Sequence, residues 1–247
     1  TSEILESLNS QDGLEAVVIG GVDPADISAE ALGQLLNTFV VSLEISHSSV
    51  TAIADVVLPV AAVTEKSGSF LDWEGRARNF DQAIEGALTR SDVRILSLLA
   101  DAIGRPIGIS TVASAANELN SIGSWDGAKS EFGGVNATSA LSVSGDQAIL
   151  TSWRRLLDNG SLQDGEANLA GTARKTVAVI SPKRAAALGV TDGQLVKISS
   201  NKGAVVLPVL VESIHDDAVW APRNSMGSEL LRTLGTAANS VVTVVKA

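Results

Sequence analysis

Apolar residues in the first part of the chain form short continuous runs separated by a helical stripe. Runs at 16–21, 39–45 and 55–63 predict three β-strands, and the last, broken only by Pro59, predicts a strand buried on both faces. After Ser28, apolar positions recur every three or four residues up to the second run, which predicts a helix. Strands and helices that alternate at this spacing predict a parallel sheet with right-handed crossovers.

A further helix is predicted to begin near Ser91 and to end before Gly104 and Pro106, because an apolar stripe lies between these cap signals. The following residues, 107–170, are rich in Ser, Gly, Ala and Asn and predict an irregular linker or insertion, with one helix around 148–157. A stretch of this length without regular structure indicates a domain boundary or a segment that becomes ordered against a partner.

Short apolar strands dominate from residue 171 onward. A Pro at the start and a Gly at the end predict a short helix over 183–188, and a second helix is predicted over 225–234. Together these elements predict a small β-barrel. The predicted strands are 176–180, 194–200, 204–211, 218–221 and 241–246. The expected domains are therefore an α/β domain over 1–106, an irregular segment over 107–170 and a β-barrel over 171–247.

Charge is spread unevenly over the 247 residues, whose formal net charge is −10. Residues 1–64 carry nine Asp or Glu and no Lys or Arg, whereas residues 171–247 carry five acidic and nine basic residues. This asymmetry predicts two modules, with an acidic face that either meets a basic partner or is simply solvated. The negative charge and an aromatic content of 3% without any Tyr disfavour nucleic acid as a partner.

Cysteine is absent, which excludes disulfides, cysteine nucleophiles, iron–sulfur clusters and thiolate zinc sites within this chain. No apolar run reaches 18 residues, so no direct membrane insertion is expected. No basic and then apolar leader opens the chain, so no export signal is expected either. Because the first residue is Thr1, we expect a processed product or part of a longer protein.

Few residues form a recognisable catalytic pattern, and no catalytic residue is assigned. His47 and His215 each have one acidic neighbour, Glu44 and Asp216, whereas a metal site needs three or four converging ligands, so no metal site is expected. No nucleophile elbow, phosphate-binding P-loop or dinucleotide glycine motif is present.

Two polar segments are candidates for binding an anion. The loop over 65–78 contains Glu65, Glu74, Arg76 and Arg78, and its mixed charge favours internal salt bridges over a bound anion. In the second segment, Arg223 and Asn224 precede the predicted helix N-terminus at Ser225, where an anion could bind, although helix capping explains them more simply.

Two separated motif runs resemble the molybdopterin oxidoreductase superfamily. The first comprises Ala54-Asp55-Val56-Val57-Leu58-Pro59, Thr64-Glu65-Lys66-x-Gly68-x-Phe70 and Glu74-Gly75-Arg76. The second, from Ser181-Pro182 through Leu188-Gly189-Val190-x-Asp192-Gly193 and into a hairpin, is similar to the C-terminal dinucleotide-binding domain, a double-psi β-barrel. The resemblance covers about residues 16–105 and 174–247. It implies an α/β fold with a parallel Rossmann-like sheet domain followed by a small double-psi β-barrel.

Within that superfamily the chain is most similar to the large iron–sulfur subunit of bacterial NADH-quinone oxidoreductase, respiratory complex I, in its actinobacterial form. This resemblance implies the C-terminal part of that subunit, with iron–sulfur clusters in an N-terminal portion outside this chain. It also implies other complex I subunits of the peripheral arm as partners, at the cytoplasmic face of the bacterial plasma membrane. The alternative is the C-terminal half of a catalytic molybdenum-pterin oxidoreductase such as a formate dehydrogenase.

The loop departs from the pattern of catalytic superfamily members at two positions. Those members carry Asn and Gln where this chain has Asp72 and Arg78. An added acid beside a pterin phosphate is unfavourable, so we expect no cofactor in this chain. If a pterin is bound, the resemblance places Glu74, Gly75, Arg76, Arg223 and Asn224 against it.

Overall fold

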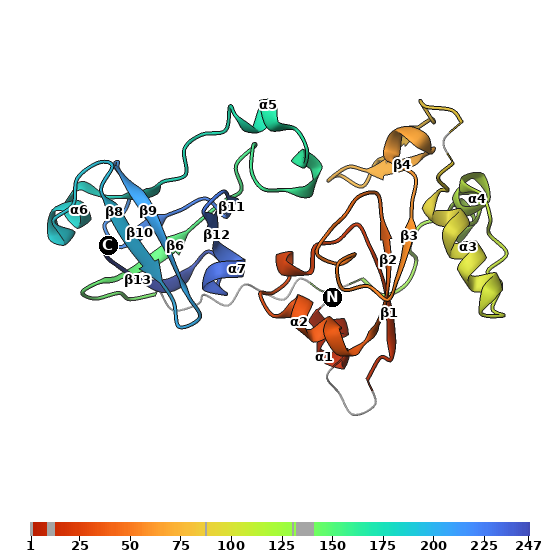
Figure 1. Cartoon of the computed structure of the whole chain (residues 1–247), viewed down its shortest axis with the longest axis horizontal. Coiled ribbons are helices and arrows are strands. Elements are labelled where there is room, and N and C mark those ends of the chain that lie inside the picture. The colour runs from red at the N-terminus through yellow and green to blue at the C-terminus, as the bar shows by residue number, and fades with distance from the viewer. Residues whose placement is uncertain (1, 9–12, 87, 130, 132–140) are drawn as a thin grey trace. The chain divides into compact units, whose positions relative to one another are not determined.

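The structure, a computed structural model, describes residues 2–8, 13–86, 88–129, 131 and 141–247 (Figure 1). The chain divides into two compact units, one with residues 1–23 and 32–134, the other with residues 24–31 and 135–247. Each unit is described by itself below. The second unit takes in residues on both sides of position 171.

A three-stranded parallel sheet with the order β1-β2-β3 forms the centre of the first unit. Because successive strands are added in one direction, right-handed crossovers place both connections on the same face. Leu35 and Val50, from the two connections, pack on that face against Val40. The strands are β1 (Ala16–Gly20), β2 (Phe39–Glu44) and β3 (Val56–Pro59), and the helices of this unit before β2 are α1 (Ser2–Leu8), α2 (Ala31–Gln34) and η2 (Leu35–Asn37). The short helix η1 (Pro24–Asp26) belongs to the second unit.

The prediction that β3 is buried on both faces is wrong. Val56 and Val57 are both exposed, and β1 likewise has no fully buried residue. The physical reason is position: β1 and β3 are the edges of a sheet in which only β2 lies between two neighbours. A continuous apolar run therefore indicates a strand correctly but not its burial.

Two helices follow the sheet. The helix predicted near Ser91 is confirmed as α3 (Asp92–Ala102), and the Ser91 hydroxyl accepts a hydrogen bond from the backbone N–H of Arg94. Ile95 of α3 packs on the second face of the sheet. The next helix, α4 (Val112–Ile122), lies within the segment predicted to be irregular and is capped by Thr111. None of the helices in the described part of the chain is long and apolar enough to cross a membrane.

The second unit is a closed six-stranded barrel with the strand order β10-β6-β13-β8-β9-β7. The barrel consists of two equivalent halves, in which β6, β7 and β8 correspond to β9, β10 and β13. Each strand pair has an equivalent pair of the same direction under this correspondence, and the parallel pair β6–β10 corresponds to the parallel pair β7–β9. This internal two-fold repeat with interlocked parallel pairs is a double-psi β-barrel, so the predicted fold class is confirmed. The strands are β6 (Gln147–Thr151), β7 (Ala178–Ile180), β8 (Leu195–Ser199), β9 (Ala204–Val211), β10 (Ala218–Trp220) and β13 (Ser240–Lys246).

Side chains from all parts of the barrel fill its interior, and the largest are fully buried: Leu150, Ile180, Ile198, Leu230 and Leu234. Leu150 lies on β6, so the prediction of a helix over 148–157 is wrong. The pairing partners of β6 lie about 70 to 90 residues further along the chain, and they impose the extended conformation. Outside the barrel, the segment that follows β6 contains only η4 (Ser161–Gln163) and α5 (Ala167–Ala170).

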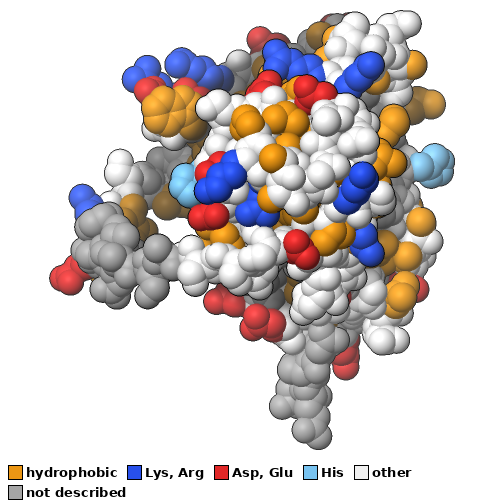
Figure 2. Space-filling model, turned by 90° about the vertical axis from the view of Figure 1, so that its left-hand side faces the viewer, with side chains coloured by type: hydrophobic (Ala, Val, Ile, Leu, Met, Phe, Trp, Pro, Cys, Tyr) orange, Lys and Arg blue, Asp and Glu red, His pale blue; other side chains and the backbone are white. Residues whose placement is uncertain are grey.

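Two short helices occupy equivalent places in the two-fold repeat, each ending at a glycine in the left-handed conformation. The helix α6 (Pro182–Leu188) ends at Gly189 and α7 (Leu230–Leu234) at Gly235. The end of α7 lies against the β8–β9 hairpin so closely that a β-carbon on Gly203 would be 2.1 Å from the carbonyl oxygen of Thr233. On the face of the molecule shown in Figure 2, Lys and Arg side chains are scattered, with Asp and Glu beside several of them.

Candidate functional site

The loop that follows β3 begins with a backbone contact between the end of β3 and the segment before α3. The backbone N–H of Ala61 donates to the carbonyl of Arg90 at 2.8 Å, so the residues before α3 run beside the end of β3. Glu65, in the short helix η3 (Val63–Glu65), links the two segments: its Oε2 accepts from the N–H of Ala62 at 3.2 Å and from the hydroxyl of Thr89 at 2.8 Å. The carboxylate of Glu65 therefore has a structural role in holding the loop.

A β-hairpin carries the remaining loop residues, with β4 (Gly68–Leu71) paired to β5 (Ala77–Phe80). Asp72 begins its turn, and the Oδ1 of Asp72 accepts from the backbone N–H groups of Glu74 at 3.0 Å and Arg76 at 2.9 Å. Gly75 has a φ of 81°, a left-handed conformation that favours glycine. Asp72 thus closes the turn on itself in the manner of an Asx turn.

Both arginines of the hairpin are paired with acids of the same loop. Arg76 Nε lies 2.9 Å from Glu74 Oε2, and Arg78 Nη2 lies 3.8 Å from Asp72 Oδ2. Exposed pairs of this kind contribute about 0–1 kcal/mol each, so they neutralise charge more than they stabilise the fold. The expectation of internal pairing is confirmed for Glu74, Arg76 and Arg78, while Glu65 is held by hydrogen bonds instead.

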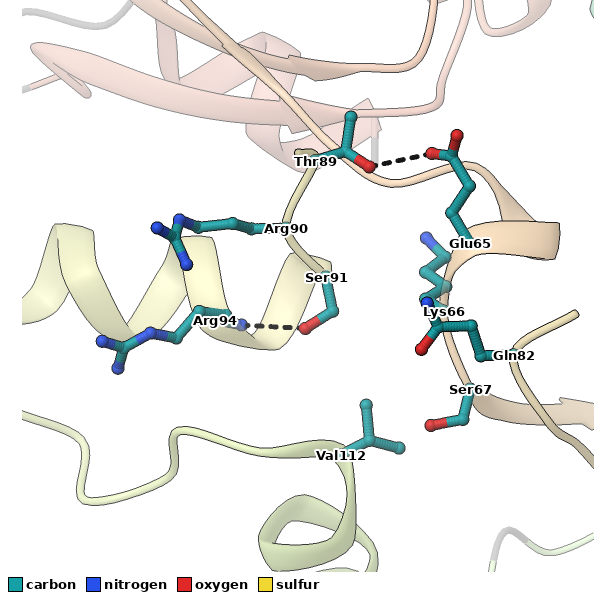
Figure 3. Close-up of a pocket in the computed structure, with 9 residues that line it drawn as sticks. All are labelled: Glu65, Lys66, Ser67, Gln82, Thr89, Arg90, Ser91, Arg94 and Val112. Carbon is teal, nitrogen blue, oxygen red and sulfur yellow. Dashed lines mark hydrogen bonds between the residues drawn. The ribbon is translucent and has the colours of Figure 1, made fainter. Parts of the chain in front are cut away.

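A polar cleft of about 300 Å³ lies beside this loop, at the N-terminus of α3 (Figure 3). Lys66 at its wall forms an ion pair with Asp92 in the first turn of α3. Figure 3 shows the guanidinium groups of Arg90 and Arg94 pointing away from Lys66, along the helix side of the cleft. The cleft is lined by Glu65, Lys66, Ser67, Gln82, Thr89, Arg90, Ser91, Arg94 and Val112.

The second predicted segment lies in the barrel unit, and its local structure differs from the prediction. Asn224 and Ser225 form β11 (Asn224–Ser225), which pairs with β12 (Ser228–Glu229) around a turn that contains Gly227 at a φ of 77°. The helix predicted to begin at Ser225 begins only at Leu230, because the tight turn intervenes. Asn224 and Arg223 therefore do not precede a helix N-terminus, so both the favoured capping role and the alternative anion site lose their structural basis.

The backbone groups of this segment are already occupied. The N–H of Arg223 donates to the carbonyl of Trp153 at 3.1 Å, and the carbonyl of Asn224 accepts from the N–H of Asn159 at 2.9 Å. Two side-chain atoms nearby in the sequence, Trp220 Nε1 and Ser225 Oγ, are buried without a hydrogen-bond partner among the described residues. Both are enclosed by protein, so neither is presented to a ligand.

Trp220 and Trp153 form an aromatic pair with ring centroids 4.7 Å apart, and the guanidinium of Arg155 lies 5.2 Å from the centre of the Trp220 ring. Arg155 also donates to the carbonyls of Arg174 at 3.0 Å and Lys175 at 2.7 Å, which ties together the two ends of the long segment between β6 and β7. Burial, and secondarily the neighbouring Arg174, lowers the pKa of Arg155. Sequence reasoning missed this cluster, because Trp153 and Trp220 lie far apart in the sequence and no local pattern joins them.

The histidines do not form a metal site among the described residues, where no group of three or more His, Cys, Asp or Glu side chains converges. His47 is exposed near the end of β2. His215 is also exposed, and its Nδ1 accepts from the backbone N–H of Asp217 at 3.3 Å. The neighbouring Asp216 pairs instead with Lys183 at 3.2 Å.

Comparison with known proteins identifies the class to which this architecture belongs. The family model described as molybdopterin oxidoreductase matches residues 3–102, and the one described as Molydopterin dinucleotide binding domain matches residues 149–246. The solved structure of acetylene hydratase from Pelobacter acetylenicus has the same fold, with a TM-score of 0.59 at 13% identity over 100% of this chain and 46% of that one. The chain belongs to the molybdopterin oxidoreductase superfamily.

The chain is similar to curated G subunits of NADH-quinone oxidoreductases. The chain is 44% identical to that of Mycobacterium bovis in an alignment of 241 positions that covers 95% of this chain and 30% of the relative. It is 38% identical to that of Streptomyces coelicolor in an alignment of 254 positions that covers 99% of this chain and 30% of the relative. The chain thus spans about a third of the length of the relatives that it matches.

The superfamily implies a pterin dinucleotide, whose phosphates would need cationic or N–H donors. In the hairpin loop, Asp72 engages the backbone donors and both arginines face acids of their own loop. In the barrel, the backbone groups of Arg223 and Asn224 are bonded within the protein. In the described part of the chain, the hairpin donors are therefore engaged within the loop, whereas the hydrogen bonds of Arg223 and Asn224 involve their backbone groups and not their side chains.

Proposed function

We propose that this chain is a non-catalytic structural portion of the G subunit of a bacterial NADH-quinone oxidoreductase. It braces the peripheral arm at the cytoplasmic face of the plasma membrane and contacts other subunits of that arm. The observation that carries this proposal is the 44% identity over 95% of the chain, which includes both units and the segment between them. Electron transfer from NADH to quinone then runs through iron–sulfur clusters outside this chain, which has no cysteine.

The hairpin loop supports the non-catalytic part of the proposal. A loop that binds an anion keeps donors available for it, whereas here each arginine lies beside a carboxylate of the same hairpin and Asp72 occupies two backbone N–H groups. An additional carboxylate at this position opposes a phosphate by simple charge repulsion. The loop keeps the framework of a cofactor-binding family while its polar groups serve the turn itself.

A catalytic molybdenum-pterin oxidoreductase, such as a formate dehydrogenase, is the second candidate. Both family models that match the chain carry molybdopterin in their description, which is the observation that favours it. In that case Glu74, Gly75, Arg76, Arg223 and Asn224 would lie against the pterin. We rank this candidate second because of the internal pairing of the hairpin.

The test is to purify the tagged protein from its own membranes and to analyse what accompanies it. We expect the other peripheral-arm subunits to co-purify together with NADH-quinone reductase activity, and molybdenum to be far below one atom per polypeptide. Stoichiometric molybdenum with formate oxidation would support the second candidate. Purification without any other subunit would refute membership of the complex.

A further inference from the structure

The polar cleft beside the hairpin carries positive charge that the nearby acids do not neutralise. Lys66 pairs with Asp92, and hydrogen bonds within the loop hold the carboxylate of Glu65. Arg90 and Arg94 line the same cleft, and neither forms an ion pair with an acid among the described residues. Figure 3 shows their side chains extending in the same direction from the start of α3. Two guanidinium groups at this cleft are therefore left without a paired carboxylate in the described part of the chain.

The position of these two arginines is electrostatically unfavourable unless an anion accompanies them. Arg90 directly precedes the N-cap Ser91, and Arg94 lies in the first turn of α3. The macrodipole of an α-helix places partial positive charge at its N-terminus, where anions are stabilised and cations are disfavoured. The acid of this first turn, Asp92, is already paired with Lys66. An anion bound by both guanidinium groups would offset the repulsion between them and the helix terminus.

Hydroxyl groups beside the arginines favour an oxyanion with several acceptor oxygens. Figure 3 shows Ser67 on the opposite side of the cleft from Arg94, and the Ser67 hydroxyl forms no hydrogen bond with the described residues. The Ser91 hydroxyl accepts from the backbone N–H of Arg94, so its own proton remains available to a ligand. The planar guanidinium fork matches the oxygens of phosphate and carboxylate alike. A phosphate group has more oxygens than a carboxylate and can accept from both arginines and from the hydroxyls together.

We propose that this cleft binds a phosphate group, either as inorganic phosphate or as a small phosphate ester. Its volume of about 300 Å³ lies at the lower end of the range of about 300–1,000 Å³ that is typical of small-ligand sites. This size favours one phosphate group with a small organic part over a dinucleotide. The inference goes beyond the proposed function and does not depend on it, because every residue that lines the cleft belongs to the first unit of this chain.

Arginine modification in the full-length subunit tests the proposal without any substitution. The subunit is treated with phenylglyoxal in phosphate or in chloride of the same ionic strength, and the modified peptides are quantified by mass spectrometry. Arg90 and Arg94 should react at least about fivefold more slowly in saturating phosphate, because the bound anion engages their guanidinium groups. Arg105, which is exposed just beyond the end of α3, is the matched control and should react equally in both buffers. Unchanged rates at Arg90 and Arg94, or equal slowing at all three arginines, would overturn the inference.

Titration calorimetry of the full-length subunit with inorganic phosphate gives an independent measurement. The double variant Arg90→Gln/Arg94→Gln should bind at least about tenfold more weakly, because it loses the charge-assisted hydrogen bonds. The double variant Arg76→Gln/Arg78→Gln has the same change in charge, but its arginines already pair within their loop, so its affinity should change by less than about twofold.

The same titration with glycerol phosphate distinguishes the two forms of the ligand. Tighter binding than that of inorganic phosphate supports a phosphate ester, and equal or weaker binding supports phosphate itself. Equal weakening by both double variants would show a general effect of charge and would refute the site. Absence of binding of either compound to the parent protein would refute it as well.

Discussion

Replacing Asp72 by alanine should loosen the hairpin turn. Its Oδ1 accepts two backbone N–H groups, from Glu74 and Arg76, at 3.0 and 2.9 Å. A hydrogen bond to a charged group contributes about 1.5–3 kcal/mol, and because the side chain is 29% exposed we reduce the expected cost to about 1–2 kcal/mol for the pair together. Amide hydrogen exchange at Glu74 and Arg76 should accelerate by roughly 5–30-fold, the equivalent of that free energy.

The matched variant Asp72→Asn separates the two roles of this side chain. Asparagine keeps an oxygen acceptor for the turn but loses the ion pair with Arg78, whose Nη2 lies 3.8 Å from Asp72 Oδ2. An exposed ion pair of this kind contributes about 0–1 kcal/mol to stability. Exchange at Glu74 and Arg76 should therefore change much less than in Asp72→Ala. Equal acceleration in both variants would show that charge pairing, and not acceptance by Oδ1, holds the turn, and our account of the loop would be wrong.

Two further predictions concern the barrel unit and use simple controls. Gly203→Ala should lower the free energy of unfolding in urea by at least about 1–3 kcal/mol, because the new β-carbon would lie 2.1 Å from the backbone carbonyl oxygen of Thr233. The control is Gly33→Ala, whose β-carbon would meet no atom within 4 Å, so this variant should be neutral or slightly stabilising. For Asp216, hydrogen bonds from Ser181 and then from Lys183 hold the pKa below its ordinary value. The ionised Asp216 carboxylate therefore contributes to folding stability at neutral pH, and this contribution is lost as pH falls below about 4. In Asp216→Asn the free energy of unfolding should fall less steeply with pH in this range than in the parent protein, and an unchanged pH dependence would contradict the prediction.

Elements defined by local signals were predicted from the sequence with good boundaries. The strand β9 (Ala204–Val211) was predicted at the same residues, because a tight hairpin turn precedes it. The helix α3 was predicted from the Ser91 cap and its apolar stripe, and the Ser91 hydroxyl does accept the capping hydrogen bond. In both cases the determining interactions lie within a few residues along the chain.

Elements that depend on distant partners were predicted less well. The strand β6 is held between β10 and β13, so no local pattern distinguishes it from the helix predicted there. The prediction that β3 is buried was wrong for a similar reason. Val56 and Val57 belong to an edge strand, and the position of a strand within a sheet cannot be read from the local sequence. Gly227 is a signal for the turn that precedes α7 (Leu230–Leu234), but the sequence prediction includes this residue in a longer helix over 225–234.

The hairpin loop shows why residue types alone cannot distinguish a binding site from a self-paired loop. Arginines and glycines on a loop at the end of a strand are what an anion site needs, and the same arginines form salt bridges when carboxylates lie within reach. What separates the two cases is the position of Asp72, whose Oδ1 lies close enough to accept from the turn and whose Oδ2 faces Arg78. Asp72 alone therefore engages two backbone N–H groups of the turn and the guanidinium of Arg78. The loop can keep the motif residues of the superfamily while these donors are no longer available to a phosphate.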